Sequence, residues 1–371
     1  MMDVLITGGC GFLGSNLAAF FQDEGARIVV VDALLRPGSS LNLAWLQQRS
    51  IGPPLIFVQA DLADREAMFG LFRRYGPFDF IAHVGGQVAM TSSLQDPHRD
   101  MQTNLIGTFN ILEAARQLSP DALIAYSSTN KVYGDLQWLR YSEEPTRYSL
   151  PDYPAGLDET LPLDFSTPYG CSKGAADQYV RDWHRVYGLK TVVFRHSSIY
   201  GGRQFASFDQ GWVGWFCLKA LEQQRARHRG EDPVPFTISG SGKQVRDVLH
   251  AEDLIRLYTA AYQNREAVAG EIFNIGGGAA NALSLLELLR RLADMLEIPP
   301  LEHVVTHRRA SDQDCFIADI SKAQRLLSWS PMISNDQGLP MMLDWISSQL
   351  APTGGEIHPS RPLLIPGDEL T

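Results

Sequence analysis

The sequence predicts an α/β protein: a doubly wound parallel sheet with a smaller C-terminal α/β lobe that binds a substrate. Two observations support this fold class. Short strands rich in Val, Ile and Leu alternate with helical segments along residues 4–195, as expected when crossover helices cover both faces of a parallel sheet. A glycine-rich turn joins the first strand to the first helix, where such folds bind their ligands. Together they predict the Rossmann-type arrangement.

The first strand, residues 4–7, leads into the glycine-rich turn and then into a helix. Gly9, Gly11 and Gly14 stand in a G-x-G-x-x-G register, and Gly8 opens an overlapping G-x-x-G-x-x-G register. Such glycines permit a tight turn and a close approach to a pyrophosphate at the helix N-terminus. The turn therefore predicts dinucleotide binding, the alternative being a glycine-rich turn in an ordinary βαβ unit. The residues assigned to the cofactor here are Gly8, Gly11, Phe12, Leu13 and Gly14.

The second strand, residues 28–31, ends in Asp32. A carboxylate at this place can accept hydrogen bonds from both ribose hydroxyls of adenosine, and it would repel a 2′-phosphate. The sequence therefore favours NAD over NADP. Arg36 follows closely and weakens this preference.

Three further strands are predicted at 55–60, 78–84 and 122–128, with a long helix at 96–118. The acid after the first of them could read the adenine amino group, and the small residues after the second let the backbone approach the cofactor. The residues assigned to the cofactor from this part of the chain are Asp61, Leu62, Gly85, Gly86, Gln87, Asn104 and Ser127.

A predicted helix that begins near Pro168 carries Tyr169 and Lys173 four residues apart, so both side chains project from one face. A phenol is a poor base near neutrality, but an ammonium nearby, and an oxidised nicotinamide ring, favour the phenolate. The pair could then take a proton from an alcohol while a hydride leaves the same carbon. The alternative is that a Tyr and a Lys share a helix face by chance.

Thr129 follows the fifth strand, at the edge of the sheet where the cofactor and Tyr169 should meet. Its hydroxyl can hydrogen-bond the reacting sugar oxygen and relay a proton to or from Tyr169. The alternative is a Thr that only caps the end of the strand.

With these residues the chain resembles the extended short-chain dehydrogenase/reductase family and, within it, the nucleotide-sugar epimerases and dehydratases, over residues 2–348. The resemblance implies an active-site triad of Thr129, Tyr169 and Lys173 and a tightly held NAD, which Tyr169 and Lys173 also contact. The dehydratases of the family carry Thr-Asp-Glu where this chain has Thr129-Asn130-Lys131. Because neither an amide nor an ammonium can replace that carboxylic pair, a 4,6-dehydratase is not expected.

Longer runs at 127–135, 169–179 and 194–205 are similar to one group of this family, the CDP-tyvelose (CDP-paratose) 2-epimerases. Residues 85–91 are similar too, although that group typically has Ala where Gly85 stands. The resemblance implies inversion of C2 in a CDP-linked sugar through a transient 2-ketone. The alternatives are a 4-epimerase or reductase acting on UDP-, GDP- or dTDP-sugars and, from a different class, a non-catalytic NAD-binding protein.

In the second half, a sixth strand at 191–195 should bring small groups toward the nicotinamide, which assigns Arg195, Ser197 and Ser198 to the cofactor. An aromatic helix from about 209 could stack on a base or sugar, or simply be core. The resemblance places Arg246 and Arg309 on the nucleotide diphosphate and Asp312 on the ribose, the alternative for Arg246 being a structural pair with Asp247 or Asp253. The full set assigned to the substrate is Thr129, Asn130, Gln204, Gln210, Gly211, Arg246, Arg309 and Asp312.

Residues 136–159 are polar and contain prolines, the composition of a loop that lies over an active site. We expect an NAD-binding domain at 1–194 plus about 243–268, and a nucleotide-sugar-binding lobe at about 195–242 and 269–348. Residues 351–371 are expected to form a loose tail.

The net charge of −10 argues against binding to nucleic acid or to an anionic membrane. Four cysteines lie far apart without a C-x-x-C pair, which indicates a reducing compartment and no metal site. No apolar run approaches membrane-spanning length and the chain begins without a signal-peptide pattern, so a cytoplasmic enzyme is expected. Family analogy suggests a homo-oligomer, a dimer or tetramer, built on helices near 98–117 and 168–187.

Overall fold

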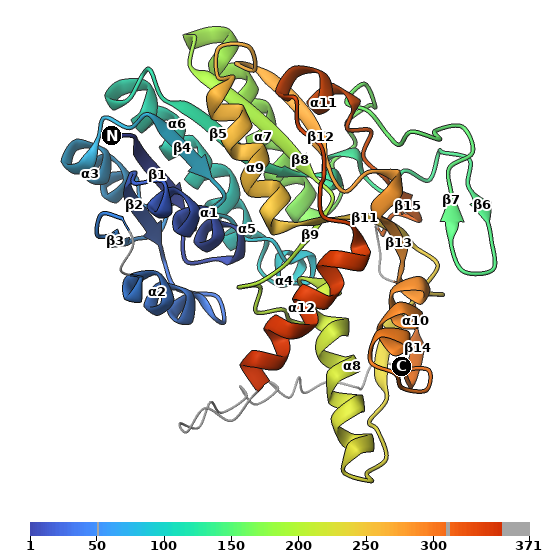
Figure 1. The fold of residues 1–371 in the computed structure, drawn as a ribbon. Helices are drawn as coiled ribbons and strands as arrows, with labels where there is room; N and C mark the ends of the chain where they lie inside the picture. Colours follow the sequence, from blue (N-terminus) through green and yellow to red (C-terminus); the bar gives the residue numbers. More distant parts are fainter. Residues whose placement is uncertain (50–51, 309–311, 351–371) are drawn as a thin grey trace.

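The computed structural model describes residues 1–49, 52–308 and 312–350. A seven-stranded parallel sheet with the order β12-β8-β5-β4-β1-β2-β3 forms its centre (Figure 1), which confirms the predicted fold class. The order reverses between β1 and β4, and this switch point is where doubly wound sheets bind their ligands. The strands are β1 (Asp3–Thr7), β2 (Arg27–Asp32), β3 (Ile56–Gln59), β4 (Phe80–His83), β5 (Leu123–Thr129), β8 (Lys190–His196) and β12 (Glu271–Ile275).

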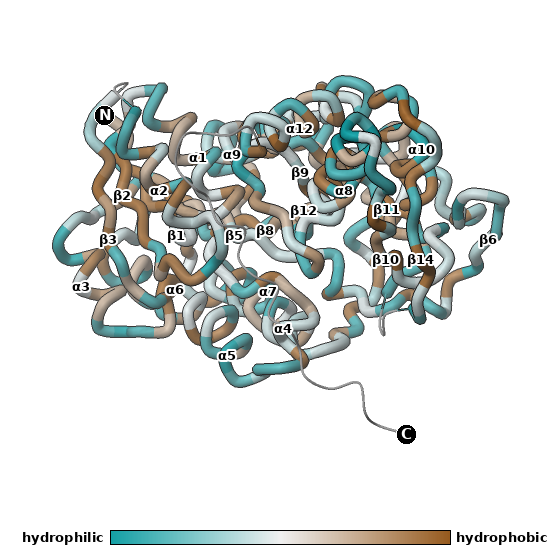
Figure 2. The backbone as a smooth tube through the Cα atoms, turned by 90° about the horizontal axis from the view of Figure 1, so that it is seen from below, coloured by the Kyte–Doolittle hydropathy of each residue, from teal (hydrophilic) through white to brown (hydrophobic). Residues whose placement is uncertain are grey.

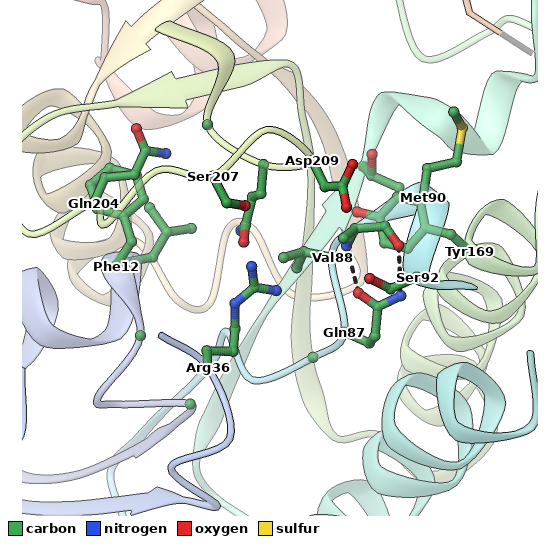
Figure 3. Close-up of a pocket in the computed structure, with 18 of the residues that line it drawn as sticks. Phe12, Arg36, Gln87, Val88, Met90, Ser92, Tyr169, Gln204, Ser207 and Asp209 are labelled. Atoms are coloured by element: carbon green, nitrogen blue, oxygen red, sulfur yellow. Dashed lines mark hydrogen bonds between the residues drawn. The ribbon is translucent and has the colours of Figure 1, made fainter. Parts of the chain in front are cut away.

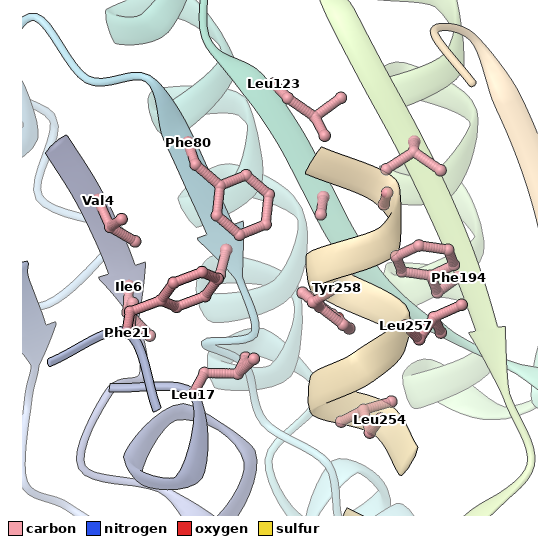
Figure 4. Packing of buried hydrophobic residues seen from close by; sticks show 14 of the residues in the cluster. Val4, Ile6, Leu17, Phe21, Phe80, Leu123, Phe194, Leu254, Leu257 and Tyr258 are labelled. Carbon is pink, nitrogen blue, oxygen red and sulfur yellow. The ribbon is translucent and has the colours of Figure 1, made fainter. Parts of the chain in front are cut away.

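Helices cover both faces of this sheet because its strands alternate their side chains between two hydrophobic cores. On β1, Val4 and Ile6 face one core and Leu5 faces the other. Figure 4 shows the first core, in which Phe21 and Tyr258 pack over the sheet. The helices on that side are α1 (Phe12–Asp23), α2 (Ser39–Gln48), α9 (Ala251–Gln263) and α11 (Ser321–Leu327), and those on the other side are α3 (Arg65–Tyr75), α6 (Gly107–Leu118) and α7 (Thr167–Tyr187).

The helix predicted at 96–118 is continuous but changes its winding. After the short helix α4 (Met90–Gln95), helix α5 (Pro97–Met101) passes into a π-helical segment at Gln102–Ile106 and then into α6. π-Helical turns inside α-helices occur frequently at functional sites. Here the turn contains Asn104, which was assigned to the cofactor.

The smaller lobe lies beside the sheet domain (Figure 2) and has its own core. Strand β10 pairs with β14 in a two-stranded sheet, whereas β11 pairs with β9, β13 and β15. Strands β10 and β11 are consecutive in the chain but belong to different sheets. The elements of the lobe are β9 (Ser198–Tyr200), α8 (Trp212–His228), β10 (Phe236–Ser239), β11 (Val245–His250), β13 (Ala282–Ser284), α10 (Leu285–Met295), β14 (His303–Thr306), β15 (Cys315–Phe316) and α12 (Asn335–Leu350).

Helix α9 packs on the main sheet between two stretches of the smaller lobe, whereas β11, just before it, pairs with strands of that lobe. We keep the division at 1–194 plus about 243–268 against 195–242 and 269–348 as a proposal, with β11 as the strand at the boundary. The expected tail, 351–371, lies outside the described residues.

The segment 136–159 does not cover the active-site cavity, and the expectation that it would is wrong. It contains the small hairpin of β6 (Ser142–Glu143) and β7 (Tyr148–Ser149), which Figure 1 shows at the outer edge of the molecule. Apolar side chains that the polar composition concealed anchor it to a separate core with Val245 and Phe316. The anchoring residues are Leu136, Leu139, Leu150 and Leu157.

Candidate active site

A cavity of about 1050 Å³ lies at the carboxyl ends of the central strands and is lined from both lobes (Figure 3). The main sheet contributes the turn after β1 and the ends of β4 and β5, and the smaller lobe contributes the start of α8 and part of β11. The predicted site residues that line it are Gly8, Gly11, Phe12, Leu13, Gly14, Asp32, Asp61, Leu62, Gly85, Gly86, Gln87, Ser127, Thr129, Asn130, Tyr169, Lys173, Ser197, Ser198, Gln204, Gln210, Gly211, Arg246 and Asp312.

The glycine turn is a cradle that side chains would fill. A Cβ on Gly14 would lie 2.2 Å from the carbonyl oxygen of Gly8. Gly8 has φ +63°, and a Cβ there would lie 2.5 Å from the Cα of Gly85. Gly11 precedes α1 without a side-chain cap, so the free N–H groups of the first turn face the cavity. These features fit the diphosphate of a dinucleotide.

Asp32 is fixed at one end of the cavity by backbone hydrogen bonds. Its Oδ1 accepts from the N–H of Leu34 at 2.8 Å, and its Oδ2 accepts from the N–H of Cys10 at 3.0 Å. Each carboxylate oxygen keeps a second lone pair that can accept a ribose hydroxyl. The geometry therefore agrees with the role expected for this carboxylate.

Tyr169, Lys173 and Thr129 meet at the other end of the cofactor path, and all three are buried. The ammonium of Lys173 donates to the carbonyl of Ser127 at 2.5 Å and lies 4.3 Å from the ring centroid of Tyr126. The Thr129 hydroxyl accepts from the N–H of Lys131 at 3.2 Å, so the capping alternative is present together with contact to the cavity.

The protein groups alone do not acidify the phenol. Burial raises the pKa of Tyr169 to about 12, against the opposing effect of a hydrogen bond with Thr129. Burial also lowers the pKa of Lys173 to about 7. The ammonium of Lys173 was expected to favour the phenolate, but burial of both groups opposes their charged forms. A phenolate therefore needs further positive charge nearby.

Asn104, which was assigned to the cofactor, is not among the residues that line the cavity. Its Oδ1 accepts from the N–H of Gln87 at 2.9 Å and its Nδ2 donates to the carbonyl of Gln87 at 3.0 Å. Ser172, next to Lys173 on α7, donates to the buried carboxylate of Asp100, which also accepts from Gln87 Nε2 at 3.0 Å. Because Asn104 Nδ2 also donates to Ser172 Oγ at 3.0 Å, this network joins the π-helical turn to α7.

Arg195 is also placed elsewhere than expected. Its Nε and Nη2 each donate to Asp177 at 2.9 Å, and its Nη1 donates to the hydroxyl of Tyr133 at 2.9 Å. Residues alternate along β8, and Arg195 points to the face covered by α7, away from the cavity. The pair is fully buried and ties α7 to the sheet.

His196, the next residue, lines the cavity and was missed in the sequence analysis. It is 5% exposed, and neither ring nitrogen has a hydrogen-bond partner among the described residues. Burial and the charge of Lys173 lower its pKa to about 3, so the ring is neutral and offers one donor and one acceptor. Such orphaned groups fit a ligand that carries an amide, as the nicotinamide ring does. Strand alternation indicates only that one of Arg195 and His196 faces the cavity, and not which one.

At the substrate end, Arg246 forms an ion pair with Asp312 at 2.7 Å, and the Nζ of Lys131 lies 3.6 Å from the same carboxylate. Although burial opposes it, these two cations hold the pKa of Asp312 below its usual range. Neither alternative partner of Arg246 is used, since Asp247 and Asp253 accept from backbone N–H groups elsewhere. Arg309 lies outside the described residues.

The substrate end also contains Asn130, which donates to Gln313 at 2.9 Å, and the segment before α8. Gln204 donates to the carbonyl of Ile199 at 3.1 Å and packs against Gly211, where a Cβ would lie 2.9 Å from the Gln204 side chain. The aromatic start of α8 was expected either to stack on a base or sugar or to be core, and its residues do not all fall on one side. Trp212 and Trp215 line the cavity, while Phe216 also belongs to the core of the lobe.

Metal binding finds no support in the part of the chain that the structure describes, where no three His, Cys, Asp or Glu side chains cluster. The four cysteines, all within the described ranges, are free thiols. Nor does any helix at 1–49, 52–308 or 312–350 have the length and apolar character needed to cross a membrane.

Known proteins resemble this chain over nearly its whole length. The profile of the NAD dependent epimerase/dehydratase family matches residues 4–276. CDP-paratose 2-epimerase of Salmonella typhi is 52% identical over 347 residues, which cover 94% of this chain and 100% of the relative. A dTDP-glucose 4,6-dehydratase of Escherichia coli is 31% identical over 365 residues, which cover 94% of this chain and 93% of the relative.

Solved structures show the same architecture. A UDP-glucose 4-epimerase from Thermotoga maritima, determined with UDP-glucose, superimposes with a TM-score of 0.77 at 28% identity and covers 94% of this chain and 100% of its own. The Thermus thermophilus UDP-glucose 4-epimerase, determined with NAD, gives a TM-score of 0.75 at 26% identity and covers 93% and 99%.

Proposed function

Because the chain belongs to the NAD dependent epimerase/dehydratase family, we propose that it inverts C2 of a CDP-linked hexose and interconverts CDP-paratose and CDP-tyvelose. The observation that carries the proposal is the 52% identity to a CDP-paratose 2-epimerase along that relative's full length. The cavity agrees with it, since a phenol and a hydroxyl adjoin a substrate end that offers an amide and an ammonium in place of a carboxylic pair.

Inversion at C2 requires oxidation, because a C–H bond beside a hydroxyl is not acidic enough for simple deprotonation. When bound, NAD would supply the hydride acceptor for the oxidation and the hydride donor for the reduction. Tyr169 takes the proton of the C2 hydroxyl, directly or through Thr129, and gives it back when the ketone is reduced. Lys173, which anchors to Ser127, orients this end of the cofactor and stabilises the phenolate.

The 2-ketone is planar at C2 and has lost its stereochemistry there. The configuration inverts if the sugar turns in the cavity before the hydride returns to its other face. We assign Arg246 to hold the diphosphate during this turn, and Arg309 to assist it. A guanidinium suits the role because it binds phosphate in a bidentate manner.

A second candidate is epimerisation at C4 of a UDP-sugar, favoured by the structural similarity to the two UDP-glucose 4-epimerases. Incubation with CDP-paratose, CDP-glucose, UDP-glucose and GDP-mannose, followed by NMR of the products, separates the two. We expect only CDP-paratose to yield a C2 epimer. Turnover of UDP-glucose with CDP-paratose unchanged would establish the second candidate.

Arg246→Gln is expected to weaken CDP binding about 10–100-fold, because it removes a charge-assisted bidentate contact. The retained NAD should not change, since Arg246 lies at the substrate end. Calorimetric titration with CDP measures the effect. Arg229→Gln, which removes a cation from an exposed pair with Glu231, is the control. Equal CDP affinity in both variants would show that Arg246 does not bind the diphosphate and serves only as the structural partner of Asp312.

We further propose a homo-oligomer built on α6 and α7. The rings of Phe109, Tyr179 and Tyr187 surround Trp183 in edge-on contacts, and all three are partly exposed. An exposed aromatic cluster on two adjacent helices is typical of an interface. Light scattering should give a dimer or tetramer, and a monomer at micromolar concentration would refute this proposal.

The free thiols support a cytoplasmic location, and the net charge of −10 supports the absence of nucleic-acid partners.

A further inference from the structure

Arg36 is a cation in the cavity to which the mechanism above gives no role. It stands in the loop between β2 and α2, and Figure 3 shows its guanidinium pointing into the cavity between Phe12 and Val88. No ion pair involves it within the described ranges. Burial lowers its pKa, and the charges of Tyr169 and Asp209 oppose that effect without contact close enough to form an ion pair.

The backbone on both sides of Arg36 is fixed. Before it, Leu34 has φ 57° and donates to Asp32. After it, the carbonyl of Arg36 accepts from the N–H and the hydroxyl of Ser39, at 3.2 and 2.7 Å, at the start of α2. The position of the Arg36 backbone at the edge of the cavity is therefore set by the fold.

The smaller lobe holds the same loop from the other side. A Cβ on Gly38 would lie 2.2 Å from the ring of Phe205, so this ring packs directly on the glycine. The guanidinium of Arg203 lies 4.0 Å from the ring centroid of Trp45, and its carbonyl accepts from Asn42 Nδ2 at 3.3 Å. Arg36 thus stands where the two lobes meet beside the glycine turn.

The N-terminus of α1 balances only part of the charge of a bound diphosphate. The N-terminus of α1 contributes roughly half a positive charge, whereas a dinucleotide diphosphate carries two negative charges. Arg246 and Lys131 lie beside Asp312 at the substrate end, away from the glycine turn, and Lys173 lies at the nicotinamide end. Arg36 lines the cofactor half of the cavity together with Phe12 of α1.

We propose that Arg36 binds the diphosphate of NAD from the side opposite the N-terminus of α1 and so keeps the cofactor in place through the catalytic cycle. The inference rests on the proposed function, in which the cofactor must remain bound while the ketone turns. Bidentate hydrogen bonds from a guanidinium to phosphate supply the contact. Arg36 thereby helps to hold NAD, whereas from the sequence alone it only weakened the preference for NAD over NADP.

The test compares Arg36→Gln and Arg36→Lys with the control Arg73→Gln, whose side chain is exposed on α3 and lies 5.6 Å from the ring centroid of Phe69. Equilibrium dialysis of each purified protein gives its affinity for NAD, ADP-ribose, adenosine and CDP. We expect Arg36→Gln to weaken NAD and ADP-ribose about 10–100-fold, since both carry the diphosphate, and to change adenosine and CDP less than twofold. Arg36→Lys should fall between, and Arg73→Gln should match the unmodified chain.

Unchanged affinity for NAD and ADP-ribose in Arg36→Gln would overturn the inference. So would a loss confined to CDP, which would place the guanidinium on the nucleotide sugar. If Arg36→Gln fails to fold, Arg36→Lys decides, because it keeps the charge and loses only the bidentate geometry. These binding measurements need no turnover, so they stand or fall separately from the proposed C2 inversion.

Discussion

Tyr169→Phe is expected to lower kcat by about 10²–10⁴-fold, the range for loss of a general acid–base group. The substitution keeps the buried ring and removes only the hydroxyl that takes the C2 proton. NAD and CDP affinities should change little, because the ring still fills its place beside Thr129. Steady-state kinetics with the substrate, together with the NAD content of the purified protein, measure both expectations.

Tyr179→Phe is the matched control, because the same hydroxyl is lost nearly three turns further along α7 from a side chain that is 41% exposed. Its kcat should equal that of the unmodified protein. A kcat for Tyr169→Phe within threefold of this control would remove the phenol from the mechanism. Another group in the cavity would then have to move the proton.

Asp177→Asn is expected to cost about 3–5 kcal/mol of unfolding free energy, the usual loss when one partner of a buried ion pair is removed. Asp177 accepts two hydrogen bonds from Arg195 at 2.9 Å and one from Ser128 at 2.7 Å, and it is fully buried. The amide leaves the guanidinium without a counter-charge in the interior. The midpoint of urea unfolding should fall accordingly.

The matched control is Asp152→Asn, which breaks a similar Arg–Asp pair on the surface. Asp152 accepts from the Nε and Nη2 of Arg140, and both side chains are half or more exposed. Such pairs contribute about 0–1 kcal/mol. Equal midpoints for the two variants would show that the buried pair contributes no more than the exposed one.

Parts of the site that depend only on residues close together in the chain could be predicted from the sequence. The glycine turn needs only the order of strand, glycines and helix, and Asp32 follows from the end of the next strand. Tyr169 and Lys173 share a face wherever a helix forms. Local spacing is sufficient for these residues because the secondary structure itself brings them together.

Features that depend on register or on distant contacts could not be predicted. Arg195 and His196 are neighbours, and which of them faces the cavity depends on how β8 sits in the sheet. Asn104 was assigned by its helix, but the π-helical turn directs its side chain to Gln87. The role proposed for Arg36 depends on the fold, which places the loop between β2 and α2 against the smaller lobe.

The segment 136–159 shows a different limit. Its prolines, tyrosines and acids suggested a cover for the active site, yet four leucines in it decide where it packs. Several of their partners, among them Val245 and Phe316, lie roughly a hundred or more residues away in the chain. Composition describes the exposed surface of such a segment but not its place in the fold.

The central claim is that C2 loses a hydride when the alcohol is oxidised and regains the same hydride when the ketone is reduced. Incubation of CDP-paratose deuterated at C2, followed by NMR of the CDP-tyvelose formed, tests it most directly. We predict that the deuterium remains on C2 of the inverted sugar and that none exchanges with water. Loss of the label to water would contradict the account, because it would show that C2 is inverted through removal of a proton.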